Sequence, residues 1–482
     1  NIEDKNGTTI LRRGADYNPQ RSWRNWLVGR PLSTADAPHQ TIGKAIGLAV
    51  FASDALSSTA YATQEMLVIL ALAGMGAFQY SIPISFAIVA LLTILTLSYE
   101  QTIHAYPGGG GAYIVARDNL GELPALMAGA ALLMDYVLTV SVSISSGVAQ
   151  IVSAFPQLFP FRIEFAVVLV IFIMTINMRG VKESGIAFSV PTYFFVVMMV
   201  ATVGTGLFRY FTHSLSVVAD PPEMELLHAA QPITFFLILR AFSNGTSAVT
   251  GVEAISNGIT AFKEPRSRNA GLTLIWMSVI LGSLLLVITF LAYHIQAIPS
   301  EEETVISQMA RTVFEGRGLL YLAAIAATTV ILIMAANTAF ADFPRLSALM
   351  AGDGFLPRQF TYRGSRLVYS RGIMALAFIA CSLIVIFQAS VTSLIPLYAI
   401  GVFLSFTLSQ LGMAHRWWKS GHLKPGEEIK ERGSTLKFES GWPFKMVANG
   451  FGSLTTAVVM VVFAVTKFTD GAWIVIFLTP ML

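Results

Sequence analysis

The sequence predicts an all-α membrane protein with twelve transmembrane helices, and both its composition and its apolar patterning indicate this class. Hydrophobic residues make up 54% of the 482 residues and charged residues only 12%, whereas soluble domains contain about 25% charged residues. Continuous apolar runs favour helices, because the strands of a membrane β-barrel alternate polar and apolar residues. Twelve runs approach the ~20 residues that one helical span needs: 43–72, 80–104, 122–155, 163–178, 187–211, 233–262, 271–295, 319–341, 372–390, 392–414, 447–466 and 471–482.

The basic residues are sorted between alternate connecting segments, and this gives the predicted orientation. Most of the 31 Lys and Arg residues fall in segments that share one side of the membrane with the N-terminus. Because cytoplasmic segments of membrane proteins are enriched in basic residues, we expect the N-terminus to be cytoplasmic. Residues 1–42 then form a cytoplasmic segment, and 43–482 form the transmembrane domain.

The first and sixth runs are longer than a membrane requires, and small polar residues interrupt both. The first reads GLAVFASDALSSTAYATQEMLVIL and the sixth LRAFSNGTSAVTGVEAISNGITAF. Interrupted helices at matching positions of two five-helix halves are typical of the binding site of inverted-repeat transporters. The alternative is a pair of kinked helices that pack closely through small residues. We favour a binding site because a carboxylate accompanies each interruption.

Three carboxylates, Asp54, Asp135 and Glu253, lie within separate apolar runs. A charged side chain at the middle of the bilayer costs roughly 2.5–3.5 kcal/mol even on lenient insertion scales. Such residues usually face a polar cavity and mark the path of an ion or a proton. We therefore expect the three carboxylates to share one site.

Hydroxyl groups accompany these carboxylates at helical spacing. Asp135, Thr139 and Ser143 are four residues apart, so they share one face of the third span. The other candidates are Tyr136 on the third span, Tyr61 seven residues after Asp54, Thr250 three residues before Glu253, and Tyr398 in the tenth span. Membrane serines and threonines often only bond to their own helix, and membrane tyrosines often anchor at the interface. These side chains contribute to a site only if their helices converge.

The donor types indicate a hard monovalent cation as the ligand. Carboxylate, hydroxyl and freed carbonyl oxygens suit hard cations, and Asp54 would repel the carboxylate of an amino acid at an opened helix. Three carboxylates around one monovalent ion cannot all be charged cheaply. We take Glu253 as the group that shares a proton and couples cation entry to proton entry; its alternative role is a structural hydrogen bond at the helix break.

Transition-metal and enzymatic chemistry are not indicated. The single cysteine, Cys381, excludes a disulfide framework and a cysteine-based metal site, and the histidines His104, His294 and His415 lie at the ends of spans. The sequence contains no recognisable nucleophile–base pair and no recognisable metal-binding motif. We therefore predict neither an enzyme nor a bound cofactor.

Glu65 and Arg240 form a separate candidate pair. Both are expected in the outer halves of the first and sixth spans, where they could meet across the extracellular vestibule. The simpler interpretation is that the pair forms a structural salt bridge. The more specific hypothesis is that it forms an outer gate.

Several segments resemble the amino acid–polyamine–organocation superfamily, and in particular its bacterial potassium uptake transporters. The glycine-rich segment YPGGGGAYIVARDNLG (106–121) resembles the superfamily's inner-loop signature. The closer resemblance extends over 43–482 and is carried by SDALSSTAYATQE (53–65), DYVLTVSVSIS (135–145), TGVEAISNGITAFKEP (250–265), AANTAFADFP (335–344) and PLYAIGVFLSFTLSQ (396–410).

This resemblance implies a LeuT-type fold with a five-plus-five inverted repeat and two additional C-terminal helices. The first repeat would span about 43–211, the second about 233–414, and the extra helices about 447–482. It implies import of K⁺ with H⁺ across a bacterial cell membrane, with Asp54, Asp135, Thr250 and Glu253 closest to K⁺. The family's ion-binding set corresponds to Asp54, Tyr61, Asp135, Tyr136, Thr139, Ser143, Thr250, Glu253 and Tyr398.

The resemblance also implies a cytosolic C-terminal domain that forms homodimers and binds cyclic di-AMP. That domain is absent from this chain, which ends twelve residues into an apolar run, so we expect the chain to be part of a longer protein. The segment 415–445 is long and charged, and we interpret it as a solvated cytoplasmic segment.

Three alternatives stay open at this stage. A proton-coupled amino-acid permease of the same superfamily would use the same fold, and a nutrient sensor would bind its ligand without transporting it. A potassium channel is disfavoured, because the sequence contains no TVGYG filter.

Overall fold

The computed structural model describes residues 2–3, 9–10, 42–109, 111–179, 184–223, 232–363, 369–431 and 433–468. These residues are mostly helical, which agrees with the predicted class. Two short antiparallel hairpins accompany the helices: β1 (Ile2–Glu3) pairs with β2 (Thr9–Ile10), and β3 (Glu428–Lys430) pairs with β4 (Thr435–Lys437).

Eight helices within the described ranges are long and apolar enough to cross a membrane. They are α5 (Ser81–Ala105, extended by the 3₁₀ turn Met75–Tyr80), α7 (Glu122–Ala154), α8 (Arg162–Met178, extended by the 3₁₀ turn Pro156–Phe161), α9 (Ser184–Phe211), α12 (Arg266–His294), α14 (Leu319–Gly352), α16 (Val391–Gly421) and α17 (Trp442–Lys467). The chain is therefore a multi-pass helical membrane protein.

The first predicted span is a bent pair of helical segments, which brings the number of candidate spans to nine. It consists of α2 (Lys44–Phe51), α3 (Ser53–Ser57), the 3₁₀ turn η2 (Ser58–Ala60) and α4 (Ala62–Ala71), with a bend of 52° after α2. This bend lies at the interruption that the sequence predicted.

The other predicted spans take shorter forms. The sixth run is divided into α10 (Phe235–Gly245), the 3₁₀ turn η5 (Thr246–Val249), α11 (Ala254–Asn257) and the 3₁₀ turn η6 (Ile259–Ala261), and the ninth is the 17-residue helix α15 (Ser370–Ile386). The run 471–482 lies outside the described residues. The short helices α6 (Ala112–Asn119) and α13 (Val305–Val313) and the turn η7 (Arg358–Thr361) belong to the connections.

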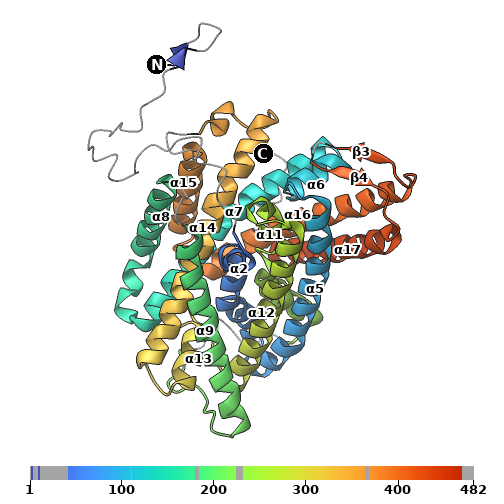
Figure 1. The fold of residues 1–482 in the computed structure, drawn as a ribbon. Helices are drawn as coiled ribbons and strands as arrows, with labels where there is room; N and C mark the ends of the chain where they lie inside the picture. Colours follow the sequence, from blue (N-terminus) through green and yellow to red (C-terminus); the bar gives the residue numbers. More distant parts are fainter. Residues whose placement is uncertain are drawn as a thin grey trace.

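The degree of burial separates inner helices from lipid-facing ones. In the most apolar window of α7, 78% of the residues are buried, against 17% for α8 with its preceding turn. Figure 1 shows α2 near the middle of the bundle, with α8 and α15 along one side. Large apolar side chains such as Phe172 on α8 and Phe378 on α15 point outward, as expected where lipid is the solvent. The helices that carry the predicted carboxylates are thus the enclosed ones.

The segment 415–445 is more ordered than the solvated segment that the sequence suggested. The helix α16 continues to Gly421, and the β3–β4 hairpin folds back beside α6 (Figure 1). The buried guanidinium of Arg416 donates to Glu431 Oε2 at 2.5 Å, and Lys419 Nζ lies 2.8 Å from Glu431 Oε1. The backbone N–H of Gly433 donates to the Asp118 carboxylate at the end of α6. The hairpin therefore connects α6 to α16 through ion pairs and a hydrogen bond.

Glu431→Gln should lower the thermal stability of the protein without affecting the distant ion site. The change leaves the buried Arg416 with a neutral partner, and breaking a buried ion pair costs about 3–5 kcal/mol; the carbonyl of Thr435 still accepts from Arg416 and reduces the loss. The measurement is the apparent Tm of the detergent-solubilised protein. As a control, Glu428→Gln breaks only an exposed pair with Lys437 and should leave the Tm nearly unchanged. Equal Tm values for the two variants would contradict this connecting role.

Candidate functional site

The break in the first span arises from hydroxyl side chains that bond to their own backbone. Ser57 Oγ donates to the carbonyl of Asp54 at 2.7 Å, and Thr59 Oγ1 donates to the carbonyl of Leu56 at 2.7 Å. Such bonds compete with the helical ladder and bend it. The helix tightens into η2, and Tyr61, with φ of −125°, separates η2 from α4. Asp54 consequently lies in the short segment α3, between the 52° bend after α2 and the 3₁₀ turn η2.

The break in the sixth span faces the first one. After η5 the chain is extended at Thr250 (ψ 154°) and turns through Gly251 (φ +81°) before α11 begins. Ser58 Oγ donates to the carbonyl of Ala248 at 2.9 Å, so a hydroxyl of the first break bonds to the backbone of the second. The predicted meeting of the two interrupted helices is therefore present in the structure.

Gly251 is packed directly against Asp54. A Cβ placed on Gly251 would lie 2.8 Å from Asp54 Oδ2 and 2.9 Å from the backbone nitrogen of Ala55. Its φ of +81° is also one that side-chain-bearing residues rarely adopt. Only glycine meets both requirements, so the second break brings bare backbone to the Asp54 carboxylate.

Asp135 of α7 completes the carboxylate group. Its carboxyl lies within hydrogen-bonding distance of the Glu253 carboxyl, and Asp54 is close enough for its charge to act on Asp135. Asp135 is 2% exposed and Glu253 is 3% exposed. Asp135 Oδ1 and Glu253 Oε2 are buried without a hydrogen-bond partner. Two adjacent buried carboxyls favour a shared proton or an intervening cation, because two bare negative charges at this distance repel strongly.

Hydroxyl groups from these same three segments and from α16 lie near the carboxylates. The Tyr61 hydroxyl is hydrogen bonded to Thr250, Thr139 Oγ1 donates to the Tyr398 hydroxyl at 3.1 Å, and Asn257 Nδ2 donates to the Tyr136 hydroxyl at 3.0 Å. Ser143 is buried on α7, one turn beyond Thr139. The helices thus converge as the sequence interpretation required.

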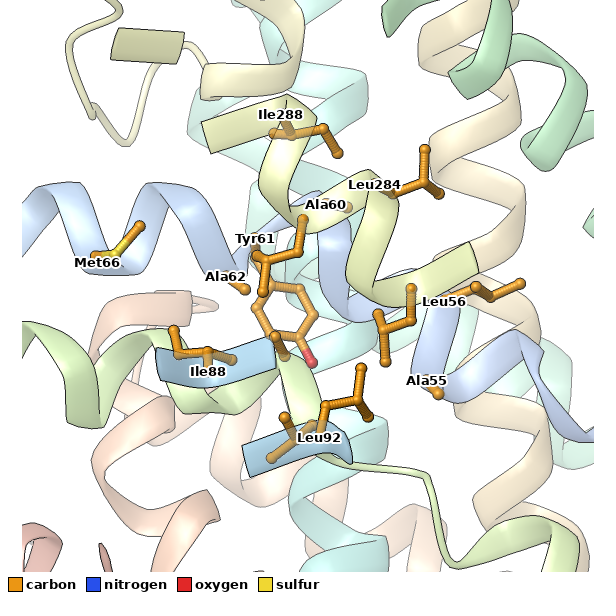
Figure 2. Close-up of a cluster of buried hydrophobic side chains, with 14 of the residues drawn as sticks. Ala55, Leu56, Ala60, Tyr61, Ala62, Met66, Ile88, Leu92, Leu284 and Ile288 are labelled. Carbon is orange, nitrogen blue, oxygen red and sulfur yellow. The ribbon is translucent and has the colours of Figure 1, made fainter. Parts of the chain in front are cut away.

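An apolar wall lies behind the tyrosine of the first break. Figure 2 shows the ring of Tyr61 among Ile88 and Leu92 of α5 and Leu284 and Ile288 of α12. These side chains exclude water from one side of the ring and leave the hydroxyl as its only polar group. An ion bound at the Tyr61 hydroxyl would therefore be contacted by oxygen, while the apolar side chains around the ring would keep water away.

Asp342 of α14 is a fourth carboxylate that the candidate list did not include. It is buried, and its charge acts on Asp54, Glu253 and Tyr136. It also lies 3.8 Å from the guanidinium of Arg345, which is largely exposed. Asp342 is the first residue after the apolar run 319–341, so the apolar pattern predicted that it lies just outside the membrane span. Because α14 extends to Gly352, the residue is inside the helix.

The expected pair of Glu65 and Arg240 is not formed among the described contacts. Thr392 Oγ1 of α16 donates to Glu65 Oε1 at 3.0 Å, and Asn244 Nδ2 donates to the backbone carbonyl of Glu65. Glu65 Oε2 has no hydrogen-bond partner. Glu65 is fully buried in α4, so it belongs to the interior of the bundle rather than to an open vestibule.

The assembled donors are oxygen atoms, which suit hard cations. Within the described ranges, no three His, Cys, Asp or Glu side chains group closely enough to hold a metal ion by themselves. Carboxylates, hydroxyls and carbonyls freed by the two breaks instead offer oxygen ligands from several helices. Because the setting is enclosed, a cation bound there would have to lose most of its water first.

Comparison with known proteins gives one family model and several relatives. The amino acid permease family model matches residues 43–482. The chain is 45% identical over 460 residues to the potassium transporter KimA of Bacillus subtilis (strain 168), covering 95% of this chain and 72% of that protein. It is 24% identical over 286 residues to the low-affinity putrescine importer PlaP of Escherichia coli (strain K12), covering 57% of this chain and 60% of that protein.

One solved structure aligns along most of the chain. It is a crystal structure of the Eremococcus coleocola manganese transporter in complex with an aromatic bis-isothiourea substituted compound. The alignment covers 98% of this chain and 94% of that chain, with 12% sequence identity and a TM-score of 0.47.

Proposed function

The chain belongs to the amino acid permease family, and from that membership we propose that it is a secondary transporter that imports K⁺ together with H⁺ by alternating access. Its 45% identity to a potassium transporter confirms the resemblance to potassium uptake transporters that the motifs predicted. The family consists of transporters, so the chain is not an enzyme, as expected.

The proposed architecture is a LeuT-type fold of twelve transmembrane helices with a five-plus-five inverted repeat. The repeats span about 43–211 and 233–414, two further helices lie at about 447–482, and the N-terminus is on the cytoplasmic side of a bacterial cell membrane. The two broken spans support this arrangement, because each is the first helix of its half and the breaks meet.

The proposed K⁺ site is the group of oxygen atoms around the two breaks. Asp54, Asp135, Thr250 and Glu253 would lie closest to the ion, with the hydroxyls of Tyr61, Tyr136, Thr139, Ser143 and Tyr398 around them. The observation that carries this proposal is the convergence of Asp54, Asp135 and Glu253 from three separate spans. These oxygens would replace the hydration shell of K⁺, and the carboxylates would offset the charge of the ion.

Coupling to protons is proposed to depend on Glu253. Its contact with Asp135 lets the two carboxyls hold one proton between them, and K⁺ entry alters the charge that this pair can carry. A membrane potential of 100 mV supplies about 2.3 kcal/mol per charge moved. Import of K⁺ and H⁺ together would therefore draw on the potential twice.

Rb⁺ uptake into proteoliposomes tests the function. With an imposed pH gradient, acidic outside, the wild-type protein should concentrate Rb⁺ against its own gradient, and excess K⁺ should suppress the signal. Uptake that does not saturate or concentrate the ion would indicate a channel, and binding without uptake would indicate a sensor. Competition by amino acids or putrescine instead of K⁺ would indicate the alternative, a proton-coupled permease for organic substrates.

Glu253→Gln should abolish the dependence of Rb⁺ uptake on the pH gradient. The amide keeps the size of the side chain but cannot take up and release the shared proton, so only the electrical potential can drive entry. The measurement is the initial uptake rate with and without the pH gradient at a fixed membrane potential. Glu428→Gln on the exposed hairpin should keep the wild-type response. If Glu253→Gln keeps it too, the coupling group must be sought elsewhere, beginning with Asp342.

The remaining proposals concern regions outside the described residues. We propose that the full-length protein forms a homodimer through a cytosolic C-terminal domain and that this domain binds cyclic di-AMP. These proposals rest on the family resemblance of the chain.

A further inference from the structure

A small cavity lies beyond the ion site along α4. Its volume is about 40 Å³, and its polar lining comes from Gln64, Ser145, Arg162, Glu301, Ser390 and Thr392. In the proposed orientation α4 leads from the break towards the outer face, because α2, on the other side of the break, begins at the cytoplasmic side. The cavity therefore lies where an entering cation would approach.

At the rim of this cavity, the negative charge of Glu301 is already offset by the positive charge of Arg162. Arg162 donates to Glu301 Oε2 at 3.1 Å, and Ser390 Oγ donates to Glu301 Oε1 at 2.7 Å. The Glu301 side chain is 51% exposed, so water competes for it as well. Because Glu301 is both paired and hydrated, it would not hold a dehydrated ion.

The inner wall carries polar atoms that lack partners. Ser145 lines the cavity, is 1% exposed, and its Oγ is buried without a hydrogen-bond partner. Thr392 lines the same cavity and donates to Glu65 Oε1, while Glu65 Oε2 is buried without a hydrogen-bond partner. Orphaned buried polar atoms are rare in folded proteins and require a partner. A cation in the cavity would supply a partner for Ser145, and Thr392 connects the cavity to Glu65.

Glu65 also connects the cavity to the central site. It lies four residues after Tyr61, on the same face of α4, and its charge acts on the Tyr61 hydroxyl. The charge of Asp54, seven residues before Tyr61 in the first span, also acts on the Tyr61 hydroxyl. Along the first span, the oxygen-bearing side chains therefore follow the order Glu65, Tyr61, Asp54, starting from the end nearer the cavity.

We propose that Glu65, with Thr392 and Ser145, forms an outer transit site that takes a monovalent cation from the cavity and passes it to Tyr61 and Asp54. This inference rests on the proposed function and deepens it. The charge of Lys467 on α17 acts on Glu65 and opposes a bound cation, so the site holds the ion weakly. Weak binding suits a transit site, because an ion must be able to leave it.

The test separates entry from binding at the central site. The concentration dependence of Rb⁺ uptake should show the KM of Glu65→Gln raised about tenfold, as expected for the loss of a charged ligand on the entry path. Equilibrium Rb⁺ binding to the detergent-solubilised protein, which reports the central site, should change less than twofold. Glu301→Gln at the rim is the matched control and should keep its KM within twofold of wild type.

Two results would overturn the transit site. One is a wild-type KM in Glu65→Gln. The other is an equal loss of equilibrium binding and uptake, which would show a structural role. If Glu65→Gln does not fold, as judged by gel filtration, Thr392→Val removes the hydroxyl at similar volume and should raise KM about threefold; an unchanged KM then rejects the proposal. Failure of the wild-type protein to take up Rb⁺ would instead reject the proposed function, and the transit site with it.

Discussion

Asp54→Asn is expected to abolish concentrative Rb⁺ uptake, with a fall in rate of at least about 100-fold. The substitution keeps the shape of the side chain and its place against Gly251, but it removes the negative charge that offsets the ion. Truncating one partner of a buried charge pair costs about 2–5 kcal/mol, and about 2.7 kcal/mol corresponds to 100-fold in binding. The hydroxyls of Tyr61 and Thr250 remain but cannot replace a full charge in a water-excluded site.

Uptake and binding should fail together in this variant, unlike in Glu65→Gln. The measurements are initial Rb⁺ uptake into proteoliposomes and equilibrium Rb⁺ binding, with Glu428→Gln as the control for loss of a carboxylate elsewhere. Gel filtration and the apparent Tm establish that the variant is folded. Its Tm should be no lower than that of the wild type, because the substitution removes a buried like charge from beside Glu253 and Asp342. Uptake at more than a third of the wild-type rate would place the ion elsewhere.

The sequence was sufficient to predict the helical class and the broken spans, and it drew attention to most of the polar side chains that converge at the breaks. Each of these depends on local information: length of an apolar run, small polar residues within it, or a carboxylate that lipid would not tolerate. Asp54, Asp135 and Glu253 were recognisable because a buried charge in such a run has no packing purpose. Their convergence could be hypothesised from the two breaks but required the fold to be observed.

Features that depend on contacts between distant segments could not be predicted. The partner of Glu65 is Thr392, which is 327 positions away, and no local pattern favours it over Arg240. Asp342 was overlooked because the helix that holds it continues past the apolar run. The hairpin in 415–445 was likewise unexpected, since its charges are satisfied by residues of the preceding helix and by α6.

Taken together, these contacts divide the first span into two functional halves around its break. In the proposed mechanism, the segment from Ser53 to Tyr61 would supply oxygens to the central site, while α4 would carry Glu65 towards the outer cavity. Beside Asp54 the second break contributes backbone, since Gly251 lies directly against its carboxylate, and two residues later the same break carries Glu253. Replacing Gly251 should therefore disturb the geometry of the site as strongly as replacing Asp54 disturbs its charge.

Gly251→Ala should accordingly reduce Rb⁺ binding and uptake by at least about 100-fold, because misplacing a reacting or binding group by about 1 Å can cost that much. The added methyl group would lie 2.8 Å from Asp54 Oδ2 and 2.9 Å from the nitrogen of Ala55. Both positions are closer than real Cβ contacts, and the second atom is backbone and cannot rotate away. Asp54 or the break itself must move, although every charged group of the site is retained.

Gly74→Ala is the matched control for this prediction. Gly74 also has a positive φ, +83° against +81° for Gly251, but a Cβ placed there meets nothing within 4 Å. Both variants carry the cost of an unfavourable backbone conformation, about 1–3 kcal/mol, so both should show a lower apparent Tm. Only Gly251→Ala should lose Rb⁺ binding. If Gly251→Ala binds Rb⁺ like Gly74→Ala, then close approach of this backbone to Asp54 is not needed to shape the ion site.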